Sequence, residues 1–80
     1  MDERRKEQRT DVDEVAYIAG DGSSLRCRVV NVSGQGATVE LPAQRYMPPQ
    51  FTLKLERTGT VRHCRLVWTS GNRIGVQFLD

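Results

Sequence analysis

Apolar and polar residues alternate with a period of two in six short runs of this chain. Such alternation is typical of strands that bury one face and leave the other in water. The runs cover residues 14–19, 25–32, 37–41, 51–56, 60–68 and 73–78. Clusters of Gly, Asn, Asp, Ser and Pro separate them, as is usual for turns. The sequence therefore predicts an all-β chain of six strands.

Residues that share a parity within a run are predicted to share a face. The expected inward sets are Leu25, Cys27 and Val29; Ala37, Val39 and Leu41; Phe51, Leu53 and Leu55; Cys64, Leu66 and Trp68; Ile74, Val76 and Phe78. On the fifth run, Val61, His63, Arg65 and Val67 are expected to face outward. Residues 42–50 hold the three prolines, which cannot donate to a strand ladder, so a loop or a single helical turn is expected there.

A chain of 80 residues is expected to form one domain, residues 1–80, near the lower size limit for an unaided core. Closing six strands into an antiparallel barrel removes the exposed sheet edges, so residues 13–80 are expected to form a barrel. Residues 1–12 are charged and lack periodic apolar positions, which favours a flexible N-terminal arm. No long C-terminal helix is expected.

Charge and composition exclude several classes of protein. The net charge of +2 is too small to predict nonspecific nucleic-acid binding. Arginine, which is suited to bidentate recognition of phosphate and guanine, supplies most of the twelve basic residues. Residues 1–14 have no secretory signal, and no apolar run approaches the length of a membrane span. We expect a soluble, cytoplasmic protein without membrane insertion, whose Cys27 and Cys64 are buried free thiols.

Catalysis and metal binding find no support in the sequence. His63 is the single histidine and lies in mid-strand on a predicted outward face. No serine or cysteine has a recognisable base partner, and two cysteines with one histidine lack metal-ligand spacing. We expect no enzyme activity, no catalytic residue, no metal site and no cofactor.

Two polar stretches contribute nothing to a core. The first is RRKEQR, in which Arg5 and Arg9 would lie about 6 Å apart in a helix or about 13 Å apart in an extended chain. The second is NVSGQG, residues 31–36. Taken alone, the first fits a solvated tail. The second fits a tight turn, where Asn31 and Ser33 bond nearby backbone and glycine supplies unusual φ. Both also fit one anion-binding site.

Together these stretches resemble the PilZ domain family, whose hallmarks are RxxxR in an N-terminal arm and (D/N)xSxxG at a strand junction. Here they stand as Arg5 to Arg9 and as Asn31 to Gly36, and CRLVWTSGNRIGVQF is similar to the end of that barrel. The resemblance implies a six-stranded barrel that binds the second messenger cyclic di-GMP. By position, Arg5 and Arg9 would clamp guanine and phosphate, and Asn31 and Ser33 would contact their edges.

The resemblance also implies roles for two further residues. Gly36 would permit the turn and a close approach of the ligand, and Arg4, which stands beside the motif, would influence whether one nucleotide or an intercalated pair binds. Gln35 departs from the family, which usually has glycine there; a positive φ at Gln35 would cost about 1 kcal/mol. The implied function is a cyclic di-GMP receptor whose arm folds over the barrel and presents a changed surface to a partner protein. A monomer or weak dimer is expected.

Two alternatives stay open. One is a degenerate PilZ-like adaptor that binds a protein without nucleotide, although degenerate members typically lose the motif arginines. The other is a small barrel that binds single-stranded nucleic acid, which needs aromatic stacking platforms on a basic groove. Since Phe51, Phe78 and Trp68 are predicted core residues, Tyr17 and Tyr46 would be a thin platform, and nucleic acid is not the expected partner. The regulated process is left open.

Overall fold

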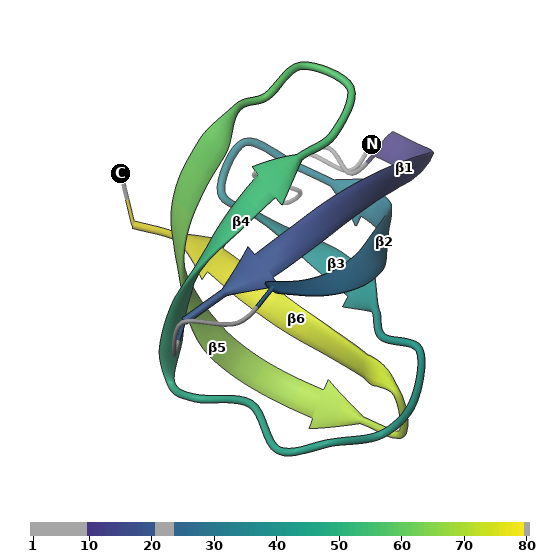
Figure 1. The fold of residues 1–80 in the computed structure, drawn as a ribbon, viewed down its shortest axis with the longest axis vertical. Helices are drawn as coiled ribbons and strands as arrows, with labels where there is room; N and C mark the ends of the chain where they lie inside the picture. Colours follow the sequence, from purple (N-terminus) through teal and green to yellow (C-terminus); the bar gives the residue numbers. More distant parts are fainter. Residues whose placement is uncertain (1–9, 21–23, 80) are drawn as a thin grey trace, which may run out of the picture.

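The expected six strands are present in a computed structural model of the chain, which describes residues 10–20 and 24–79. They are β1 (Thr10–Ala19), β2 (Ser24–Val32), β3 (Gly36–Glu40), β4 (Gln50–Leu55), β5 (Val61–Ser70) and β6 (Arg73–Phe78). All neighbours pair antiparallel and close a barrel in the order β1-β2-β3-β6-β5-β4 (Figure 1). The predicted all-β class and six-stranded antiparallel barrel are confirmed. The described ranges contain no helix that could cross a membrane.

Strand β1 begins at Thr10, four residues before the start that alternation predicts. Thr10 lies opposite Val32 and Asp11 opposite Asn31 on β2. A charged stretch carries no alternation, so the pairing with β2 extends this strand beyond its sequence signal. Three residues assigned to the arm therefore belong to β1. The arginines expected to bind ligand from the arm, Arg4, Arg5 and Arg9, lie outside the described residues.

The barrel core matches the predicted inward faces at most positions. Its buried apolar side chains are Ala16, Ile18, Cys27, Val29, Ala37, Val39, Leu41, Met47, Phe51, Leu53, Cys64, Ile74 and Val76. Cys27 and Cys64 are free and buried, as predicted. The proline-rich segment is a loop that crosses the lower end of the barrel in Figure 1, where Met47 and Leu41 are buried. That end is closed by side chains of the loop.

Three register shifts break the strict alternation of the described strands: one on β1 between Asp11 and Glu14, and two β-bulges on β5 and β2. On β5, Leu66 lies opposite Val76 but Trp68 lies opposite Gly75, so Val67 is an extra residue. The bulge turns Trp68 to the outer face, where it is 43% exposed. The prediction that Trp68 belongs to the core is wrong, because one inserted residue reverses the parity of the residues after it.

The second bulge is on β2, where Val29 lies opposite Val39 and Asn31 lies opposite Thr38. Val30 is the extra residue. Without it, Asn31 would share the inward face of Val29. With it, Asn31 lies on the outer face, next to the turn between β2 and β3.

Candidate ligand-binding site

The turn between β2 and β3 is organised by Ser33. Its Oγ accepts hydrogen bonds from the backbone N–H groups of Gln35 (3.2 Å) and Gly36 (3.3 Å). The Ser33 N–H donates to the Gly36 carbonyl at 2.8 Å. Ser33 is only 8% exposed. The structural role expected of Ser33 is therefore present: its side chain shapes the turn.

No residue of this turn has the left-handed backbone conformation. Positive φ occurs at Gly59 and Gly71, and at no non-glycine residue of the described chain. The expectation that glycine supplies unusual φ in this turn is wrong for Gly34 and Gly36. Gln35 carries no strain of that kind, so its departure from the family pattern costs nothing through φ.

Gly36 is instead required by packing against β6. A Cβ at this position would lie 2.1 Å from the carbonyl oxygen of Val76. The Phe78 N–H also donates to the Gln35 carbonyl at 2.8 Å. The turn is thus held against β6, and Gly36 is the residue that permits this approach.

The strand registers place Asn31 in a row on the outer face of the barrel. Asp11 lies opposite Asn31, Asn31 opposite Thr38, Thr38 opposite Gly75, and Gly75 opposite Trp68. Because neighbouring strands are about 4.8 Å apart, Asn31 and Gly75 are separated by about 10 Å. Trp68 covers Gly75, since a Cβ there would lie 2.1 Å from the indole Nε1. The row therefore runs along the outer surface from the amide of Asn31 to the exposed ring of Trp68.

A second row lies beside the first and ends at the turn. Gly36 lies opposite Gln77, and Gln77 opposite Arg65. The Arg65 Nη2 donates to the Gln77 Oε1 at 2.5 Å. The two rows border a hollow of about 290 Å³ whose lining includes Gln35, Gly36, Trp68, Arg65 and Gln77.

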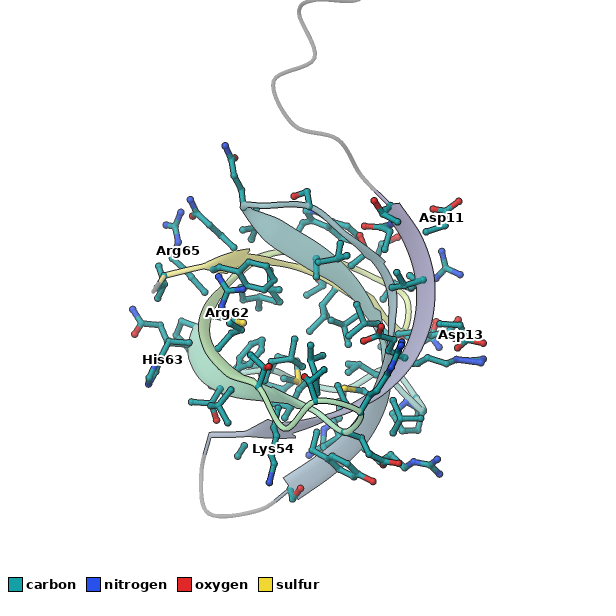
Figure 2. The ribbon with its side chains drawn as sticks, turned by 90° about the horizontal axis from the view of Figure 1, so that it is seen from above. Asp11, Asp13, Lys54, Arg62, His63 and Arg65 are labelled. Atoms are coloured by element: carbon teal, nitrogen blue, oxygen red, sulfur yellow. The ribbon has the colours of Figure 1, made fainter. Side chains whose placement is uncertain are left out.

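The side-chain partner of Arg65 differs in charge from the partners of two other arginines on the barrel surface. Arg28 is paired with Asp13 (3.2 Å) and Glu40 (3.9 Å), and Arg73 with Glu40 (3.6 Å). The side-chain bond described for Arg65 is to the neutral Gln77. In Figure 2, Arg65 points outward from β5, and Asp11 and Asp13 lie on the opposite side of the barrel. An anion in the hollow would meet Arg65, whereas Asp11, the carboxylate of the Asn31 row, lies at the far end of that row on β1.

Sequence reasoning missed Trp68 and Arg65 as site residues. Period-two counting placed Trp68 in the core and Arg65 on an unremarkable outer face. A signal was present in Gly75, because a glycine inside a strand often marks the close approach of another group. Of the residues expected from the motifs, Gly36 lines this hollow. Asn31 lies opposite Thr38, which also lines it, and Ser33 is hydrogen-bonded to Gly36. His63 is exposed and points outward, as expected (Figure 2).

Comparison with known proteins agrees with this architecture. The PilZ domain model matches residues 3–80, nearly the whole chain. No curated protein matched this sequence. PilZ domains are binding modules rather than enzymes. With a closed six-stranded barrel and a family match of this extent, the chain belongs to the PilZ domain family, which is in general a family of cyclic di-GMP receptors.

Proposed function

We propose that this protein is a cytoplasmic receptor for cyclic di-GMP. The observation that carries the proposal is the pairing of Thr10 with Val32 at the start of β1. Thr10 comes directly after Arg9 in the sequence, and Val32 precedes Ser33 of the motif turn. The chain carrying both motif arginines is therefore joined to the barrel beside the turn that carries the second motif.

The reach of the arm is sufficient for both arginines to act at this site. Consecutive Cα atoms are about 3.8 Å apart, and five residues span at most about 18 Å. Arg9 and Arg5 are one and five residues from Thr10. Their guanidinium groups match the O6 and N7 acceptors of guanine and also the oxygens of phosphate. In the proposal they hold the ligand from the arm, with Arg4 beside them.

The barrel supplies the other half of the proposed site. Asn31 offers an amide donor and acceptor, and Ser33 and Gly36 fix the turn at the rim of the hollow. Trp68 offers an exposed ring on which a guanine can stack, and Arg65 offers a cation near it. Stacking of a base on an aromatic side chain is worth about 1–3 kcal/mol.

Energetics require the arm and the barrel to act together. Ordering five arm residues costs about 5–10 kcal/mol of backbone entropy. One bidentate contact supplies about 1–3 kcal/mol, so neither arginine alone holds the arm. In the proposed mechanism the ligand folds the arm onto the barrel, and the new surface is presented to a downstream protein.

The single tryptophan of the chain allows a direct test. Trp68 lies in the hollow, so its fluorescence reports a guanine that stacks on it. Titration with cyclic di-GMP is expected to change the emission in a saturable way at micromolar concentrations, whereas GMP at the same guanine concentration leaves it unchanged. Unchanged emission, together with unchanged amide NMR signals of residues 31–36, would favour an adaptor that binds no nucleotide.

A further inference from the structure

Arg65 and Trp68 lie next to each other on the outer face of β5. Arg65 lies opposite Gln77 and Trp68 opposite Gly75, and both partners belong to β6. Gln77 and Gly75 are two residues apart, so they point to the same face and are separated by about 7 Å along the strand. Arg65 and Trp68 both line the outer hollow of about 290 Å³. A planar base stacked on the indole would therefore turn one edge toward the guanidinium of Arg65.

The side chain of Gln77 fixes the position of this guanidinium. The Arg65 Nη2 donates to the Gln77 Oε1 at 2.5 Å. Gln77 is half-buried, lies between Gly36 and Arg65 in the strand register, and also lines the hollow. A long side chain that is already held loses less conformational freedom when it binds a ligand. Gln77 therefore prepares Arg65 for contact with a ligand in the hollow.

The residues on either side of Arg65 in the sheet do not balance its charge. Gln50 lies opposite Arg65 on β4, and Gln77 lies opposite it on β6. Both side chains are neutral amides. A guanidinium has several N–H donors, and the bond to Gln77 uses one of them. Donors for two parallel hydrogen bonds to a ligand therefore remain, together with the positive charge.

A group that only donates hydrogen bonds discriminates between the purine bases. Guanine presents two neighbouring acceptors, O6 and N7, whereas adenine presents the acceptor N7 and the donor N6–H₂. Arginine has no acceptor, so it pairs with both atoms of guanine but meets the amino group of adenine donor to donor. Bidentate pairing of arginine with O6 and N7 is the commonest specific contact to guanine. Beside a stacked base, Arg65 therefore favours guanine.

From this arrangement we propose that Arg65 is a specificity-determining residue of the barrel and that Gln77 is its positioning residue. Arg65 selects guanine over adenine, through O6 and N7, in the base that stacks on Trp68. This role rests on the proposed function, since it needs a cyclic dinucleotide in the outer hollow. It gives the barrel a recognition of the base that is separate from the roles proposed for Arg5 and Arg9 in the arm.

Titration of the full-length protein with cyclic di-GMP and with cyclic di-AMP, followed by amide NMR so that weak binding is also measured, tests the role of Arg65. The wild type is expected to bind cyclic di-GMP more tightly by about tenfold or more. Arg65→Gln is expected to weaken cyclic di-GMP about tenfold without weakening cyclic di-AMP, because glutamine matches N6 and N7 of adenine. Arg45→Gln is the matched control: it removes an exposed arginine from the proline-rich loop and should change neither affinity.

The outcomes separate this proposal from the function on which it rests. If the wild type binds neither nucleotide, both fail. If the wild type binds cyclic di-GMP but Arg65→Gln keeps the same ratio of the two affinities, the receptor function stands and the assignment of Arg65 is refuted. An equal loss for both nucleotides would mean that Arg65 contacts a phosphate, which the two nucleotides share. Equal binding of both nucleotides by the wild type would also refute the assignment.

A double-mutant cycle tests the positioning role of Gln77. Gln77→Met keeps the length of the side chain and removes the acceptor, so it is expected to weaken cyclic di-GMP severalfold and to leave cyclic di-AMP unchanged. In the Arg65→Gln background the same substitution is expected to change neither affinity, because the two residues act as a unit. Additive losses in the double variant, or an unchanged affinity of Gln77→Met for cyclic di-GMP, would refute the positioning role.

Discussion

The indole of Trp68 covers Gly75 so closely that a Cβ at Gly75 would lie 2.1 Å from Nε1 and 2.3 Å from Cε2. The two residues face each other across β5 and β6. Gly75 thus provides the space in which the ring lies against the sheet while one side stays in solvent. A ring held in this way loses little freedom when a base stacks on it, which favours binding.

We predict that Gly75→Ala lowers the affinity for cyclic di-GMP severalfold while the barrel remains folded. The added methyl group displaces the indole, because the nearest atoms belong to a side chain that can move. The measurement is the tryptophan emission of the free protein together with a binding isotherm. Gly34→Ala is the control, since a Cβ there meets nothing within 4 Å. A shifted emission with unchanged affinity would show that Trp68 does not contact the ligand.

Gly36→Ala is predicted to destabilise the whole barrel. Its Cβ would meet a backbone carbonyl, that of Val76, at 2.1 Å, and a strand backbone cannot rotate away as a side chain can. Overpacking of this kind costs about 1–3 kcal/mol or more. Urea unfolding is expected to show the loss in Gly36→Ala and almost none in Gly34→Ala. Comparable stability of the two variants would contradict the packing role of Gly36.

Much of the fold could be predicted because the strands obey a period of two. The six strands, the loop over residues 42–49 and the buried Phe51 and Leu53 are consistent with alternation and turn composition. The barrel was predicted because closing the sheet removes its exposed edges. The local sequence is sufficient to predict which face of a strand a residue occupies, as long as no bulge interrupts the alternation.

The bulges at Val30 and Val67 could not be predicted in this way. A bulge depends on how two strands far apart in sequence pair, and it reverses every face after it. For this reason the sequence identified Asn31, Ser33 and Gly36 by motif but assigned Trp68 to the core. The role of Gly36 was likewise hidden, because the carbonyl that excludes a side chain there belongs to Val76, forty residues later.

Arg9→Ala is predicted to abolish measurable binding of cyclic di-GMP rather than weaken it a few-fold, and Arg5→Ala should do the same. The entropic cost of ordering the arm, about 1–2 kcal/mol per residue, exceeds the binding free energy that the remaining arginine contributes. Calorimetry of the variants is the measurement. Lys6→Ala removes the same charge from the same arm, at a variable position between the two motif arginines, and should bind almost as wild type. Full-affinity binding by Arg9→Ala would refute the clamp.

Stability is predicted to fall at alkaline pH through Cys27. Burial raises the pKa of this thiol from 9.0 to about 12. The unfolded chain releases the proton first, so the stabilising contribution is complete below pH 9 and is lost as pH rises from 9 toward 12. The pKa of Tyr17 is also raised, chiefly by its hydrogen bond to Glu56, and acts in the same direction.

The contribution of Cys27 can be isolated by comparison with Cys27→Ala. Urea unfolding at about pH 8 and about pH 10, on either side of the ordinary thiol pKa, should show a larger loss of stability in the wild type than in the variant. The Tyr17 contribution is present in both proteins and cancels. An equal loss in both would mean that Cys27 does not retain its proton in the folded state.

The most direct test of the central claim is isothermal titration of the purified protein with cyclic di-GMP at moderate salt. Saturable binding at micromolar or tighter concentration is predicted, with a ratio near one for a single nucleotide and near two for an intercalated pair. The affinity should depend only modestly on salt, since few phosphates are involved. Absence of heat, with no thermal stabilisation by excess ligand, would contradict the assignment of this chain as a cyclic di-GMP receptor.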